Sequence, residues 1–104
     1  MAVVQAQVQV DDQDPSTPVL LFTASADCVV NVFCVNPDDA PQEAFIEVRL
    51  QDAAQSDEQL LVPGTMVGPT DRIVEGPVYL ASGDTVYVYG SHADQVFSLY
   101  GSTL

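Results

Sequence analysis

The sequence contains no lysine and no tryptophan, and Arg49 and Arg72 are its only arginines. Fifteen Asp and Glu residues give it a formal net charge of −13. Nucleic acids and anionic membrane surfaces bind through clusters of Lys and Arg, which two arginines cannot form. The composition therefore predicts neither a nucleic-acid nor a membrane partner. The acidity fits a solvated surface that keeps the protein in solution, a salty environment, or a partner with basic or metal-bridged patches.

Long apolar segments are also missing, since no run approaches the roughly 18 residues of a membrane span. Even so, 47% of the 104 residues are hydrophobic and only 16% are charged. This balance is typical of packed globular chains and not of disordered ones. A chain of this length predicts one domain with its own core.

Residues suited to catalysis or metal binding are scarce. The only histidine, His92, stands in the short segment GSHAD, where Ser91 and Asp94 are too close in sequence to build a catalytic triad with it. The aspartates at 11, 12 and 14 and at 38 and 39 lack the spacing and central glycine of a calcium loop, which leaves solvated loop acids as the preferred interpretation. We therefore expect no enzyme, no cofactor and no metal site.

Cys28 and Cys34 are six residues apart in the apolar run CVVNVFCV. In a strand this even spacing directs both thiols to one face, with Cα atoms roughly 20 Å apart. A disulfide needs about 4.4 to 6.8 Å between Cα atoms. We therefore predict two reduced, buried cysteines.

Short runs rich in β-branched and aromatic residues predict an all-β chain. They cover residues 19–24, 28–35, 44–50, 58–62, 78–81, 84–90 and 95–101. The Pro- and Gly-rich stretch 63–77 is expected to be a loop, with room for a small strand at 72–75, and 51–59 allows one helical turn. The predicted fold is a single antiparallel β-sandwich, jelly-roll or Ig-like, with a small barrel as the alternative.

The N-terminal segment alternates, with Val4, Ala6, Val8 and Val10 on one face and mainly glutamines on the other. The acidic, proline-containing segment 11–18 then separates it from the rest of the chain. We expect residues 1–17 to form a first strand or an extended N-terminal arm, and residues 18–104 to form the β-sandwich domain.

Two C-terminal segments are apolar on both faces, unlike strands that have one side in water. Tyr87 and Tyr89 face away from Val86 and Val88, and Tyr100 faces away from Phe97. A second layer must cover these rings: the N-terminal arm, the 63–77 loop or another protein surface.

Two stretches resemble known sequences. VVNVFCVNPDDAPQEAFIEVRL is similar to a segment in which a strand ends in an Asn-led turn and pairs with the next strand, and LASGDTVYVYGSHADQVFSLYG is similar to the closing hairpin LxxGDTVxVxSSxAxVSFxAYG. Together they resemble small β-sandwich virion proteins of tailed phages, which serve as capsid decoration or cement proteins or as modules of tail fibres and adaptors. The resemblance covers about half of the chain.

The resemblance implies a non-enzymatic structural protein that is made in the host cytoplasm and incorporated into the virion, where it binds and stabilises the capsid shell. Its partners would be the major capsid protein, copies of itself, or both, in a homo-oligomer such as a trimer. The expected interface residues are Val4, Ala6, Val8, Val10, Tyr87, Tyr89, Phe97 and Tyr100. The alternative is a tail-fibre or receptor-binding module whose loops at 36–43 and 90–94 contact a host glycan or protein, although those loops contain no aromatic residue for sugar stacking.

Overall fold

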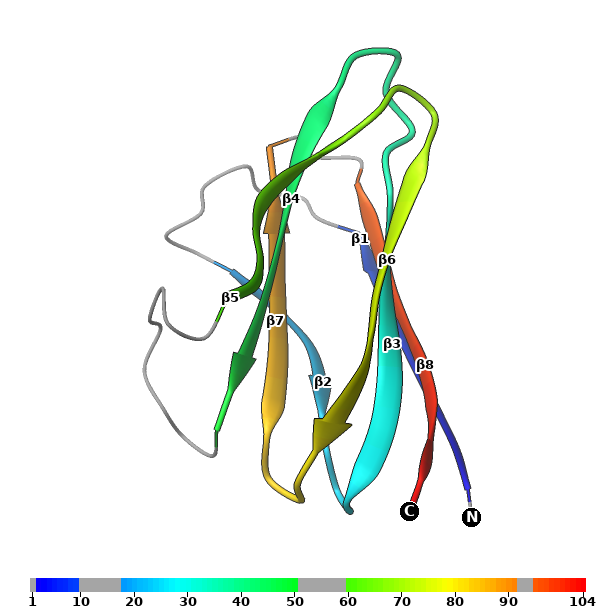
Figure 1. The fold of residues 1–104 in the computed structure, drawn as a ribbon, viewed down its shortest axis with the longest axis vertical. Helices are drawn as coiled ribbons and strands as arrows, with labels where there is room; N and C mark the ends of the chain where they lie inside the picture. Colours follow the sequence, from blue (N-terminus) through cyan, green and yellow to red (C-terminus); the bar gives the residue numbers. More distant parts are fainter. Residues whose placement is uncertain (1, 10–17, 51–59, 92–94) are drawn as a thin grey trace.

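A computed structural model of the chain describes residues 2–9, 18–50, 60–91 and 95–104. These ranges contain strands and no helix, which confirms the all-β prediction (Figure 1). The strands are β1 (Val3–Gln9), β2 (Val19–Thr23), β3 (Cys28–Val35), β4 (Gln42–Arg49), β5 (Leu60–Val67), β6 (Arg72–Leu80), β7 (Thr85–Gly90) and β8 (Val96–Thr103). Accordingly, nothing in the described ranges has the length and hydropathy of a membrane-spanning helix.

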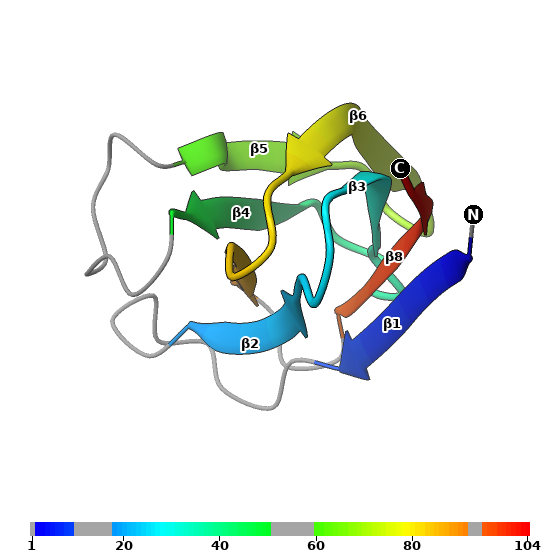
Figure 2. The ribbon, with the colours of Figure 1, turned by 90° about the horizontal axis from the view of Figure 1, so that it is seen from below.

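The strands form two antiparallel sheets that pack face to face as a sandwich (Figure 2). Sheet A has the order β1-β8-β3-β6, and sheet B has the order β2-β7-β4-β5. Every connection except that between β4 and β5 passes from one sheet to the other, and the first and last strands are neighbours. This is the strand order of a jelly roll, so the sandwich is not Ig-like.

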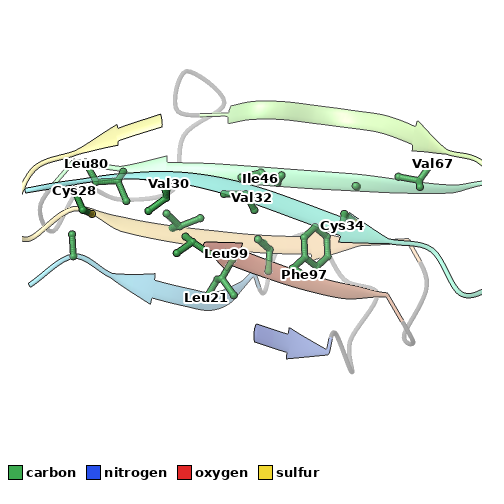
Figure 3. Packing of buried hydrophobic residues seen from close by; sticks show 14 residues of the cluster. Leu21, Cys28, Val30, Val32, Cys34, Ile46, Val67, Leu80, Phe97 and Leu99 are labelled. Carbon is green, nitrogen blue, oxygen red and sulfur yellow. The ribbon is translucent and has the colours of Figure 1, made fainter. Parts of the chain in front are cut away.

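The core lies between the sheets and is built by the alternation of each strand. In β3, Cys28, Val30, Val32 and Cys34 are buried, whereas the residues between them are not. Figure 3 shows Val30, Val32 and Cys34 in the interior with Leu99 and Phe97 of β8 and Ile46 of β4, and Cys28 beside Leu80 of β6. Both cysteines are free and buried, as predicted.

The N-terminal segment pairs with the rest of the chain. Residues Val3 to Gln9 form an antiparallel ladder with β8, from Val3 opposite Ser102 to Gln9 opposite Val96. The extended N-terminal arm is therefore not confirmed, because residues 3–9 are an edge strand of sheet A. Val10 and the rest of the segment 10–17 lie outside the described residues, as does the segment 51–59.

The predicted loop at 63–77 is wrong for most of its length, because β5 continues through Pro63 and β6 through Pro77. Both strands are at sheet edges, where a residue without an N–H group costs no hydrogen bond on the open side. The pairing of β5 with β4 and of β6 with β3 shifts register near these prolines. Only residues 68–71 connect the two strands.

Two strand pairs predicted from the resemblance are also wrong. β7 and β8 are not a hairpin, since β7 lies in sheet B between β2 and β4, and β8 lies in sheet A between β1 and β3. Likewise β3 and β4, on either side of the Asn-led turn, belong to different sheets. A short connection suggests a hairpin, but in a jelly roll it more often turns from one layer to the other.

Candidate interaction surface

The outer face of sheet A is set by the cross-strand register. The buried positions of β3 point inward, so the positions between them point outward, and residues directly opposite on a neighbouring strand share that face. The outward residues are Val29, Asn31, Phe33 and Val35 of β3; Val96, Ser98, Tyr100 and Ser102 of β8; Val3, Gln5, Gln7 and Gln9 of β1; and Arg72, Val74 and Tyr79 of β6. We call this surface the acid-free face.

No outward residue of these four strands is Asp or Glu, although the chain contains fifteen. Arg72 is their only charged side chain. The acids of the described ranges lie elsewhere: Asp27, Asp38, Asp39, Asp71 and Asp84 in connections between strands, Glu43 and Glu47 on β4, and Glu75 in the inward row of β6. In the described ranges the acids are thus placed in connections between strands and on sheet B, apart from Glu75, which is in the inward row of sheet A.

The acid-free face also exposes large apolar side chains. Tyr79 is 71% exposed, Tyr100 and Val74 are each 52% exposed, and Val3 is 80% exposed. The Tyr100 ring contacts Phe33 edge-on, with 5.7 Å between the ring centroids. Tyrosine-rich surfaces without carboxylates are typical of the centre of protein–protein interfaces, from which Asp, Glu and Lys are depleted.

Two shallow hollows lie along this face. One, of about 200 Å³, is lined by Gln5, Ala6, Gln7 and Tyr100. The other, of about 280 Å³, is lined by Val35, Thr70, Asp71 and Arg72. The first hollow has no charged side chain in its lining, whereas Asp71 and Arg72 line the second, which lies beside the connection between β5 and β6.

The structure separates the residues predicted as an interface. Val4, Ala6 and Val8 form the inward row of β1 and are half-buried against the core. Phe97 is fully buried in the core, and Tyr89 is 5% exposed, with its ring stacked on Phe45 at 4.5 Å between centroids. Phe97 and Tyr89 are therefore corrected from interface residues to residues packed within the chain.

Tyr87 lies on the outer face of sheet B, where the guanidinium carbon of Arg49 is 3.8 Å from the centre of its ring. Arg49 in turn pairs with the carboxylate of Glu47, which is 1% exposed. A charge this deeply buried needs a partner. The second face of β7 is thus covered within the chain, and of the predicted rings only Tyr100 is open on the surface.

The residues considered for chemistry have structural roles where they are described. The Ser91 hydroxyl accepts a hydrogen bond from the Glu43 backbone N–H at 2.7 Å and donates one to Oε1 of Gln42 at 2.8 Å. Asp38 accepts a hydrogen bond from the Gln42 side chain. His92, Asp94 and the aspartates at 11, 12 and 14 lie outside the described residues. Within the described ranges, no three His, Cys, Asp or Glu side chains gather as a metal site.

Both thiols are held in the protonated form. Burial raises the pKa of Cys34 from 9.0 to about 12, against a smaller lowering by the hydrogen bond from Gln95. The pKa of Cys28 is also raised, first by burial and then by the negative charges of Asp27 and Asp84. A thiol is a poor nucleophile and metal ligand without its thiolate form, so these cysteines act as core residues.

Sequence reasoning missed most of the acid-free face. Val74 lies in the stretch 63–77 that was expected to be mainly loop, and Tyr79 was not selected although it lies in the predicted run 78–81. A signal was present in the sequence. The alternate residues of 28–35 and 96–102 that face away from the core include no acid, in a chain where about one residue in seven is acidic.

Comparisons with protein families, with curated proteins and with solved structures found no match for this chain.

Proposed function

We propose that this chain is a non-enzymatic structural protein that binds another protein through the acid-free face, and that it serves as a capsid decoration protein of a tailed phage. The first part of the proposal rests on one observation: on a chain of net charge −13, one sheet face has no carboxylate and exposes Tyr79, Tyr100 and Val74. The second part rests on the resemblance of its sequence to small β-sandwich virion proteins.

The physical argument starts from electrostatic repulsion. A molecule with this charge repels most acidic protein surfaces, and desolvating an unpaired carboxylate in an interface costs several kcal/mol. A partner that brings no basic groups can dock closely only where carboxylates are absent. Among the described strands, the outward residues of sheet A meet that condition, whereas the outer face of sheet B exposes the carboxylate of Glu43.

The proposed attachment is testable by substitution on the two sheets. Tyr100→Glu combined with Val74→Glu places two carboxylates on the acid-free face, and both positions are about half exposed. We expect this variant to keep its fold and to bind capsid shells of the encoding virus at least tenfold more weakly in co-sedimentation, a loss of about 1.4 kcal/mol.

The matched control combines Leu20→Glu with Met66→Glu, which adds the same charge at similarly exposed apolar positions of sheet B. We expect it to bind shells like the unaltered protein. Equal weakening by both variants would place attachment elsewhere. Failure of the unaltered protein to sediment with shells would contradict the decoration role, and its location on the tail would favour the receptor-binding alternative.

A further inference from the structure

The four edge strands of the sandwich differ in how they are protected against pairing with another chain. Unprotected edges invite strand addition, and proteins block it with proline, charge, bulges or short strands. In sheet B, β2 has five residues and a register shift, and β5 contains Pro63 and two register shifts. In sheet A, β6 contains Pro77, a register shift and charged residues.

The fourth edge strand, β1, carries none of these features. Its seven residues, VVQAQVQ, include no proline and no charged side chain, and its ladder with β8 runs without a register shift. It lies at the end of sheet A (Figure 2), and its exposed outward side chains are valine and glutamine. In a chain with so many acids, a seven-residue edge strand without a single charge is an edge suited to pairing.

Two backbone hydrogen bonds fix which groups of β1 face outward. Thr103 N–H donates to the carbonyl of Ala2, and Leu104 N–H donates to the carbonyl of Asp27, so odd-numbered residues of β8 bond to β1 and even-numbered residues bond to β3. Because antiparallel strands alternate, Val4, Ala6 and Val8 bond to β8. The N–H and C=O groups of Val3, Gln5 and Gln7 point to the open edge.

We propose that β1 pairs antiparallel with β1 of a second copy around a two-fold axis at Ala6, joining two copies of sheet A into one continuous sheet. In this register Gln5 faces Gln7 of the second copy in the hydrogen-bonded pairs, and Val4 faces Val8. Ala6 faces Ala6 of the second copy in a non-hydrogen-bonded pair, where the two Cα atoms are closest and a small side chain fits best. Each row is thereby matched: valine with valine on the inner side and glutamine with glutamine on the outer side.

The absence of charge favours a second copy as the occupant. Two molecules of net charge −13 can pair only along an edge that sets no carboxylate against another, and β1 meets this condition. Each β1 edge takes one strand, so the assembly closes as a dimer and not as the trimer that the resemblance suggested.

The dimer also bears on the proposed function, because it places two acid-free faces side by side. That these joined faces bind a capsid shell rests on the proposed function. Four strands about 4.8 Å apart and seven residues of about 3.3 Å give one acid-free face a projected area of roughly 440 Å². A stable interface buries about 800 Å² on each partner. Two faces side by side reach that size, which one face alone does not.

A cysteine on the axis tests the register. Ala6→Cys places the two new thiols opposite each other in the closest pair of the joined strands, and we expect mild oxidation of the native protein to give a disulfide-linked dimer. Met66→Cys, at a half-exposed position on the edge strand of the other sheet, is the control and should give at least tenfold less dimer. Equal crosslinking of both variants would contradict the proposed pairing.

Two edge variants test the pairing itself by sedimentation velocity without any capsid. Gln5→Pro removes an N–H that points to the open edge and leaves the ladder with β8 intact, and Gln5→Glu with Gln7→Glu sets carboxylates against each other across the axis. Both should reduce the dimer fraction at least tenfold. The control, Ser25→Glu with Ala26→Glu, adds the same charge in the exposed β2–β3 turn and should leave the dimer unchanged.

A monomer or a trimer of the unaltered protein at high concentration would overturn the dimer. The proposed function fails separately, through the shell-binding assay. A protein that dimerises but binds no shell retains the edge pairing and loses the decoration role, whereas a monomer that binds shells retains the role and loses the pairing.

Discussion

Gly101 lies in β8, between β1 and β3, at a place where no side chain fits. A Cβ atom added there would be 2.0 Å from the carbonyl oxygen of Val29, and that oxygen belongs to the backbone of the neighbouring strand. Because backbone cannot move aside cheaply, we expect Gly101→Ala to lower the free energy of unfolding by about 2 to 4 kcal/mol. Denaturant titration measures the change.

Gly68 supplies the control for Gly101. A Cβ added at Gly68 would have its nearest neighbour 3.7 Å away, which is an ordinary contact. Gly68→Ala should therefore change the unfolding free energy by less than about 0.5 kcal/mol. Equal effects of the two substitutions would show that the close approach of β8 to β3 does not determine stability at this position.

The raised pKa of the Cys34 thiol predicts how the free energy of unfolding changes with pH in the alkaline range. Its pKa is about 12 in the folded chain and 9.0 without burial, so above pH 9 the unfolded chain releases a proton that the folded chain retains. The stabilisation is complete below pH 9 and is lost as the pH rises toward 12, by up to about 1.4 kcal/mol per pH unit. Cys34→Ala should therefore lose less stability than the unaltered protein between pH 9 and 11. Identical slopes would contradict the retained proton.

At the scale of elements, one residue joins the connections at the end of the sandwich opposite the termini (Figure 1). Asn36 is fully buried, and its side-chain amide donates hydrogen bonds to the carbonyls of Ala40, Val67 and Gly68, while its oxygen accepts one from the Asp38 N–H. It therefore ties the β3–β4 connection to the end of β5. This explains why the turn begins with asparagine, which bonds readily to nearby backbone.

Removal of the Asn36 side chain leaves these buried backbone groups without their partner. We expect Asn36→Ala to lower the free energy of unfolding by about 2 to 3 kcal/mol. Asp39→Ala, an exposed change in the same loop, should stay within about 0.5 kcal/mol. Thermal or chemical unfolding of the two variants checks the difference, and a small loss for Asn36→Ala would mean that water replaces the amide.

The elements also show how far the sequence carries a prediction. Alternation at the N-terminus and short runs rich in β-branched and aromatic residues located at least part of each strand in the described ranges, and even spacing placed Cys28 and Cys34 on one face of β3, because these patterns depend only on neighbouring residues. The sheet to which a strand belongs depends on contacts between residues far apart in the sequence. The two strands that contain Tyr87 and Tyr100 were therefore expected to form a hairpin, although they lie in opposite sheets. Pro63 and Pro77 suggested a loop because proline excludes a central strand, but both belong to edge strands, where that rule does not apply.

The prediction of the interaction surface was limited in the same way, because local sequence does not show which distant residues cover a side chain. The rings of Tyr87 and Tyr89 suggested an open face from local sequence, but Arg49 and Phe45, from a strand some forty residues earlier, lie against them. Tyr79 lies in the predicted run 78–81, but its place on the outer face follows from the pairing of β6 with β3, which is not a local feature of the sequence. What local sequence does contain is the lack of acids at alternate positions, and this feature marks the surface once the register is known.

At the scale of the whole molecule, net charge determines how association responds to salt. Copies of net charge −13 repel each other over a distance of about 30 Å at 0.01 M salt and about 10 Å at 0.1 M. The shortest dimension of the molecule is 19 Å, so at the lower salt the charges of one copy act across the whole of the other.

We therefore expect self-association through β1 to strengthen as salt rises, with a dissociation constant that falls severalfold between 0.01 and 0.1 M. An interface made of ion pairs would show the opposite trend, because salt screens attraction as well as repulsion. Sedimentation equilibrium across this range measures the dissociation constant, with sucrose at matched density as the control for solution effects other than charge. A dissociation constant that rises with salt would show that the copies meet through charged groups, and the uncharged edge strand β1 would then not be the contact.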